Sequence, residues 1–151
     1  MPQTTAAVIE QCAKVEMSAD GITYVDISGN VQSWSNMTQT RSTGEAYTFS
    51  GDTAIVGAGK RQPLDATFNI VYTETDADVY QVIRNQFENT CGGLYYIRIS
   101  PKGGDAGEER IVLYGVISSF TYPEMDASTG QPVMAGFVIH AGSVTSSVIA
   151  S

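Results

Sequence analysis

The chain has little histidine, cysteine and positive charge, and each shortage excludes a kind of site. One histidine, His140, among 151 residues is too few for a histidine metal site and leaves any catalytic triad without an identifiable third group. Cys12 and Cys91 are far apart in sequence and fit no metal or redox spacing, so we expect free thiols in a reducing compartment. The net charge of -8 disfavours phosphate binding by counterion release.

Long apolar runs are also missing. No segment is long and apolar enough to span a bilayer, so we expect no membrane insertion. The first residues lack the basic start and continuous apolar stretch of a signal peptide. Because glycosylation requires a secretory route, we interpret the sequon at Asn36 as a chance occurrence. No internal repeat is present, and 151 residues suit one domain that buries a core without disulfides or metals.

What the chain does have is a series of short alternating segments separated by turn residues. The clearest is residues 64–72, where apolar side chains at every second position predict a strand with one buried face. We expect further strands at residues 13–17, 22–27, 31–34, 45–49, 53–56, 94–99, 111–117 and 133–140. Residues 35–44 and 57–63 are interpreted as exposed loops, and Gly115 as a bend or bulge in its strand.

One helix is predicted, at about residues 75–90. Thr75 is the expected N-cap, with Asp78 three residues on as an approximate capping box and Asp76 adding negative charge at the helix start. Gly92-Gly93 is the stop signal. The expected buried stripe consists of Val79, Val82, Ile83 and Phe87.

Nine strand-like segments and one helix predict a mainly β fold, either a β-sandwich or a partial barrel with one flanking helix. We divide the chain into an N-terminal arm at 1–12, a single domain at 13–142 and a C-terminal tail at 143–151. The small residues of the tail suggest that it becomes ordered only against a partner.

No motif predicts catalysis, a cofactor or a metal site. The run GAGK at 57–60 resembles the end of a phosphate-binding loop, but Ala54 stands where the first glycine is needed and Arg61 replaces the required Ser or Thr. The acidic groups at 76–78 and 105–109 do not follow the calcium-loop pattern. We therefore predict that catalytic, cofactor-binding and metal-ligating residues are all absent.

Several pieces of the sequence, in their order and spacing, resemble the major tail tube proteins of long-tailed, siphovirus-type bacteriophages. They are VDISG at 25–29, TGEAYTFSGDTAIVGAGKRQPL from residue 43, NIVYTET leading into VYQVIRNQFE, and SPKGG at 100–104. Together they span most of residues 13–142. The two ends depart from the resemblance, so contacts made by residues 1–11 and 143–151 are not carried over.

The resemblance implies a tail-tube-like, non-enzymatic virion protein. Its copies would self-assemble into hexameric rings that stack into the hollow tube of the phage tail, built in the host cytoplasm. Implied partners are further copies of the chain and the tape measure, tail terminator and distal tail proteins. DNA would pass transiently through the lumen during ejection, and the acidic balance fits a lumen that repels phosphate.

The resemblance also suggests candidate residues. The candidates for contacts between subunits or stacked rings are Trp34, Asn36, Gln39, Arg41, Lys60 and Arg61. The candidates for lumen-facing positions are Asp65, Thr67 and Asn69, because they form the polar side of a strand whose other side is apolar.

Two other interpretations stay open. The first is a soluble carbohydrate-binding or hydrolytic β-sandwich protein, in which an acidic pair and exposed tyrosines would form a cleft. The second is another virion component with the same fold, such as the tube of a contractile tail or a tail-completion protein. Rings or tubes in solution would favour a structural role, and a neighbouring sheath gene would favour the contractile version.

Overall fold

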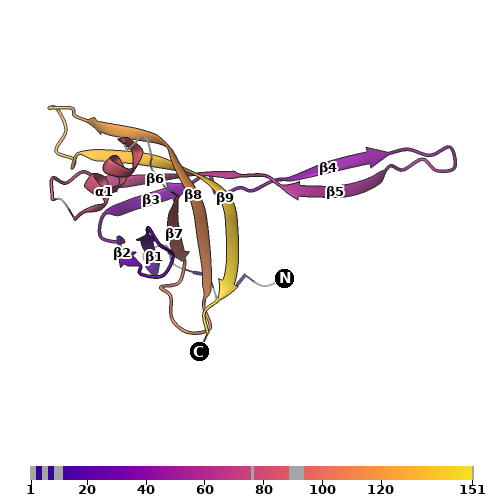
Figure 1. Ribbon diagram of the computed structural model, residues 1–151, viewed down its shortest axis with the longest axis horizontal. Helices are drawn as coiled ribbons and strands as arrows, with labels where there is room; N and C mark the ends of the chain where they lie inside the picture. Colours follow the sequence, from indigo (N-terminus) through magenta and orange to yellow (C-terminus); the bar gives the residue numbers. More distant parts are fainter. Residues whose placement is uncertain (1–2, 5–6, 9–11, 76, 89–93, 151) are drawn as a thin grey trace.

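One curled sheet dominates the computed structural model, which describes residues 3–4, 7–8, 12–75, 77–88 and 94–150 (Figure 1). Its seven strands lie in the order β2-β1-β7-β8-β9-β6-β3. They are β1 (Lys14–Ser18), β2 (Val25–Asp26), β3 (Val31–Ser35), β6 (Leu64–Val71), β7 (Tyr95–Ser100), β8 (Glu109–Glu124) and β9 (Met134–Val148). Strands β4 (Arg41–Ala46) and β5 (Ile55–Arg61) pair only with each other, and α1 (Val79–Glu88) packs beside β8 and β6. The predicted mainly β fold with one helix is confirmed, in its partial-barrel form.

The long strands β8 and β9 are curved, and the sheet curls along them (Figure 1). The first part of β8 pairs with β7 on one side, while β9 follows β8 along most of its length with a register shift between Tyr114 and Gly115. A Cβ atom at Gly115 would lie 2.0 Å from the carbonyl oxygen of His140 and 2.6 Å from the Cα of Ala141. No side chain fits this approach of two backbones, so the predicted bend at Gly115 is confirmed.

The core lies on the concave side of the sheet. The predicted alternation along β6 is confirmed, because Leu64, Ala66, Phe68 and Ile70 are each at most 2% exposed. Phe68 stacks on Phe137 of β9 with ring centroids 5.1 Å apart, and α1 adds Val79, Tyr80 and Ile83 to the same cluster.

The helix begins at Val79 rather than at Thr75, so the predicted N-cap is wrong. The carbonyl of Thr75 instead accepts from the amide of Asp78 at 3.0 Å, which closes a turn before the helix, and the Asp78 carboxylate accepts from the Thr73 hydroxyl at 2.7 Å. The stripe is also rotated, because Tyr80 is buried while Phe87 is 36% exposed. Asp76 and Gly92-Gly93 lie outside the described residues.

Two predicted loops are wrong in part: residues 36–40 lie in no strand, as predicted, but the rest of the first loop and most of the second are strand. Residues 41–44 belong to β4 and residues 57–61 to β5, so the connection between these strands is residues 47–54. Apolar alternation marks strands with one buried face, and these two strands have none. The expectation for the C-terminal tail is also wrong as far as Val148, because that part of β9 pairs with residues 109–114 of β8.

The first predicted turn, at Asp20-Gly21, is confirmed. Gly21 has a φ of 79°, and the Asp20 carboxylate accepts from the amides of Ile22 at 2.8 Å and Thr23 at 2.9 Å. These two hydrogen bonds, with a third from Ser18, lower the pKa of Asp20 to about 2. The strand that follows is shorter than predicted, because only Val25 and Asp26 pair with β1.

Candidate functional site: the arm and the polar face

Residues 41–61 form a hairpin, the arm, that projects from the curled sheet along the long axis of the molecule (Figure 1). Every residue of β4 and β5 is exposed. The arm nevertheless carries large apolar side chains, with Phe49 fully exposed and Tyr47 72%, Val56 69% and Ile55 63% exposed. A two-stranded hairpin is marginally stable alone in water, so the arm has the composition of a surface that another molecule covers.

Polar side chains fix the root of the arm. Gln39 donates to the carbonyl of Gln62 at 2.9 Å, and Arg41 donates to the carbonyl of Gly59 at 2.8 Å. Arg61 donates to the Gln39 side chain at 2.9 Å and to the carbonyl of Val144 in β9 at 2.8 Å. Three of the six predicted contact residues therefore brace the root of the arm, where Gln39 and Arg41 join its two sides and Arg61 ties it to β9 of the sheet.

The other three predicted contact residues lie in different surroundings. Lys60 is exposed on β5, and among the described residues no acidic side chain pairs with it. Trp34 is half-buried on β3 and packs against the core cluster. Asn36 has a left-handed φ of 62° and donates to the hydroxyl of Thr67 at 3.0 Å, so it lies beside a predicted lumen residue and away from the arm.

The three predicted lumen residues share the side of β6 that faces away from the core. Asn69 donates to the Ser33 hydroxyl of β3 at 3.0 Å, and the carboxylate of Asp65 lies 2.6 Å from Nδ1 of His140 in β9. We call this surface the polar face, defined by Ser33, Asp65, Thr67, Asn69 and His140. It runs across three neighbouring strands, with Val138 of β9 on the same side, opposite Thr67.

Sequence reasoning missed the pairing of Asp65 with His140. The two residues are 75 positions apart, and only the register of β6 against β9 brings them opposite each other. Their side chains are 63% and 48% exposed, and no hydroxyl or thiol of the described residues hydrogen-bonds to the histidine. The pair is therefore an exposed surface contact rather than part of an activated nucleophile.

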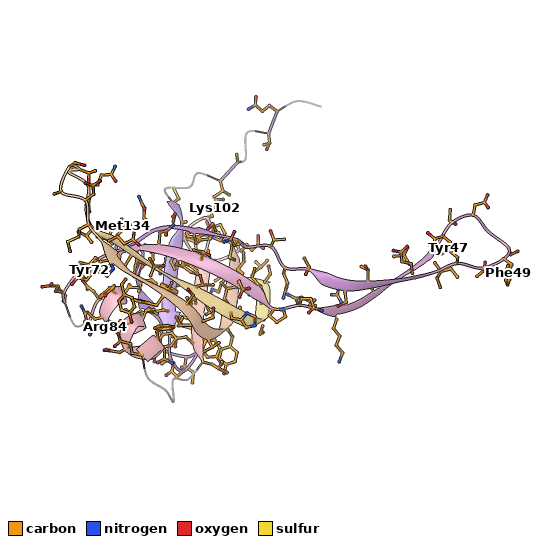
Figure 2. All side chains as sticks on the ribbon, turned by 90° about the horizontal axis from the view of Figure 1, so that it is seen from above. Tyr47, Phe49, Tyr72, Arg84, Lys102 and Met134 are labelled. Atoms are coloured by element: carbon orange, nitrogen blue, oxygen red, sulfur yellow. The ribbon has the colours of Figure 1, made fainter. Side chains whose placement is uncertain are left out.

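A groove of about 730 Å³ is lined in part by Met134, which lies at the end of the molecule opposite the arm (Figure 2). It runs between the polar face and the 125–133 connection, which joins β8 to β9. Its apolar lining includes Met125, Pro132, Met134 and Val138, and Glu124 and Asp126 also line it. The Asp126 carboxylate accepts from the amide and hydroxyl of Ser128 at 2.9 and 2.7 Å, and these bonds lower its pKa.

Metal ligands and membrane spans were also sought in the described part of the chain. No three of its His, Cys, Asp and Glu side chains are grouped so that they could hold a metal ion. None of its helices is long and apolar enough to cross a membrane. Cys12 is exposed and unpaired, and Cys91 lies outside the described residues.

Solved structures share this fold, although no protein-family profile and no curated protein sequence matches the chain. A chain of the extended sheath-tube complex of the extracellular contractile injection system PVC matches with a TM-score of 0.75 and 15% identity, over 96% of this chain and 94% of that one. The anti-feeding prophage cap, which terminates the tube, matches at 0.73 and 16%, over 98% and 95%. The SPP1 tail tube matches at 0.62 and 13%, over 96% and 81%.

These similarities establish the fold, which is that of proteins from injection-system tubes and a phage tail tube. The predicted tail-tube-like architecture is thereby confirmed. The matches include contractile systems as well as a phage tail, so they do not single out long-tailed phages.

Proposed function

We propose that this protein is the structural subunit of a tail tube, in which hexameric rings stack into a hollow conduit for DNA ejection. The observation that carries the proposal is the arm, whose strands are exposed along their whole length and whose apolar side chains have no cover within the subunit. An arm of this kind becomes stable by docking on another molecule. The match to tube proteins over nearly the whole chain supports a second copy as that molecule.

Contacts made by the arm would be heterologous, since the arm is a feature that projects from one end of the subunit only (Figure 1). Heterologous contacts build rings when the rotation closes and open stacks when it does not. Gln39, Arg41 and Arg61 would hold the direction of the arm, and Lys60 would contribute a free positive charge. Trp34 and Asn36, on the sheet edge strand β3 and just after it, remain candidates for contacts within a ring.

In this assembly the polar face would line the lumen. Asp65, Thr67 and Asn69 present short polar side chains there, and the net charge of -8 would repel the phosphates of passing DNA. A reconstruction of the tube with these three residues on its outer surface would contradict the assignment.

Negative-stain electron microscopy of the purified protein tests the proposal directly. We expect hollow tubes of uniform width with sixfold end views, at concentrations where a variant lacking residues 47–54 stays monomeric. A wild-type protein that remains a monomer at every concentration and binds glycans would favour the soluble carbohydrate-binding alternative instead.

A charge reversal gives a sharper version of the test. Lys60→Glu should reduce tube formation if the arm docks on an acidic copy of the chain. Lys102→Glu makes the same change in net charge at an exposed position in the turn before β8, and should leave assembly unchanged. Equal effects of the two variants would mean that only net charge matters.

A second candidate function is the tube of a contractile injection system. It is favoured by the TM-score of 0.75 to a chain of the PVC sheath-tube complex, against 0.62 to the SPP1 tail tube. A sheath gene beside the gene of this protein, together with co-purification of sheath and tube in the extended state, would support it. Tubes recovered without any sheath from the native particle would support the long-tailed phage.

A further inference from the structure

Several strands of the molecule have an open edge, which is a side without a paired neighbour. An open edge presents a row of backbone N–H and C=O groups that can pair with a strand of another molecule. Proteins disfavour such pairing with very short strands, bulges, prolines or charged side chains at the edge. The open edges of this molecule differ in which of these features they have.

Three of the open edges have such a feature in their own sequence. Strand β2 has only two residues, one of which is Asp26. Strand β3 has a register shift against β6 between Val31 and Ser33. The part of β8 that extends beyond its pairing with β7 contains Pro123 and Glu124. These features disfavour non-specific pairing with another strand.

The last part of β9 has an open edge with none of these features. The pairing of β9 with β6 ends at Ala141, whereas its pairing with β8 continues to Val148. Residues 143–148 are therefore paired on one side only, and they form the free end of β9 near the C-terminus in Figure 1. Their sequence, SVTSSV, contains no charge and no proline, and their register against β8 has no shift.

The same segment is suited to pairing with a second copy of itself. Antiparallel pairing of two copies centred on Ser146 would place Val144 opposite Val148, with no like charges facing each other. Val148 is 69% exposed, so this contact would also remove apolar surface from water. An edge with this sequence therefore needs protection from elsewhere in the chain.

Arg61, at the root of the arm, provides a charge at this edge. Its guanidinium donates to the carbonyl of Val144 at 2.8 Å. The side chain of Gln39 accepts from Nε of Arg61 at 2.9 Å and donates to the carbonyl of Gln62 at 2.9 Å, so it orients the guanidinium. Among the described residues, no other hydrogen bond joins residues 143–148 to any element except β8.

We propose that Arg61 blocks the open edge of β9 in the unassembled subunit, and that without it two copies pair edge to edge through residues 143–148. A second strand would have to displace the guanidinium from the Val144 carbonyl, and two copies would bring two Arg61 charges to one interface. The pairing is isologous, so it closes a dimer and does not extend into a ring or stack. The inference concerns the single subunit and does not depend on the proposed tube.

Sedimentation velocity of the full chain tests the proposal, at concentrations below those at which wild type forms tubes. Wild type should be a monomer, whereas Arg61→Ala should form a dimer whose fraction rises with concentration. Arg41→Ala is the matched control, because it removes the same charge from the root of the arm, where Arg41 donates to Gly59 and not to β9. An Arg61→Ala protein that stays monomeric, or a control that dimerises equally, would overturn the proposal.

A double variant tests whether the dimer uses the edge of β9. Val148 is exposed, so Val148→Lys leaves the core intact and places a charge on the open edge. In the Arg61→Ala chain it should restore the monomer. Amide hydrogen exchange at Val144 and Ser146 should be slower by about tenfold or more in the Arg61→Ala dimer than in the monomeric double variant. A dimer that persists in the double variant, with unchanged exchange at these two amides, would also overturn the proposal.

Discussion

The arm and the curled sheet are both antiparallel β structure, yet different interactions hold them in place. Strand β9 is paired on both sides over residues 134–141 and packs Phe137 into the core, whereas β4 and β5 have only each other and no buried residue. This part of β9 is therefore held by its own subunit. The arm is anchored at its root by Arg61, and in the proposed tube a second molecule would cover it along its length.

The largest effect that separates the two regions is expected at their glycines. Gly115→Val would place a side chain against the carbonyl of His140, where even a Cβ would be 2.0 Å away, so we expect a loss of about 4 kcal/mol or more and little folded protein. Gly57→Val in the arm meets only one neighbouring atom at 4.0 Å and should change stability by less than about 0.5 kcal/mol. Urea unfolding of both variants measures the difference, and comparable losses would contradict the distinction.

Removing one aromatic ring from each region should separate stability from assembly. Phe137→Ala breaks the stack with Phe68 in the core and should cost about 3–5 kcal/mol. Phe49→Ala removes a fully exposed ring, so we expect an unchanged unfolding curve but shorter or absent tubes by electron microscopy. Destabilisation by Phe49→Ala would show that the arm folds back onto its own subunit.

The same contrast explains what the sequence could predict. Strand β6 was found because burial of one face imposes alternation on Leu64, Ala66, Phe68 and Ile70. The arm is predicted only in part: the predicted strands at 45–49 and 53–56 overlap β4 and β5 at residues 45–46 and 55–56. The other bounds are wrong because nothing inside the subunit imposes a pattern on the arm, and its glycines look like loop residues. The groove and the Asp65–His140 pair depend on strand register and on a connection packed over a sheet, which no local pattern encodes.

The predictions for the start of the helix and for the C-terminal tail are wrong for related reasons. Thr75 has the right side chain for an N-cap. Its carbonyl instead accepts from Asp78 in the turn that comes before the helix, so the local sequence allows two structures and does not decide between them. Residues 143–148 are mostly serine and threonine, and they form strand because β8 pairs with them.

Two side-chain pairs on the sheet, one buried and one exposed, give a smaller test of the same contrast. Arg98 donates to both carboxylate oxygens of Glu16 at 3.0 and 2.7 Å, Glu16 is 7% exposed, and the guanidinium lies 3.8 Å from the centre of the Tyr24 ring. Glu16→Gln should cost about 1–3 kcal/mol, because it leaves a half-buried guanidinium without its anion. Asp65→Asn on the polar face should cost less than about 0.5 kcal/mol in the same denaturation assay.

The smallest expected effect compares the turns of two hairpins, one on the sheet and one on the arm. The Asp20 turn is held by hydrogen bonds to its carboxylate, whereas none of the side-chain hydrogen bonds of the described residues involves residues 47–54. Because folding lowers the pKa of Asp20 from 3.8 to about 2, the ionised carboxylate contributes stability above pH 3.8 that is lost as the pH falls towards 2.

Asp20→Asn should therefore melt at a lower temperature than wild type at neutral pH, and the two melting temperatures should converge near pH 2. Asp52→Asn, in the connection between β4 and β5, should have the same melting temperature as wild type at pH 7. A gap between Asp20→Asn and wild type that persists unchanged at pH 2 would mean that the carboxylate charge does not hold this turn.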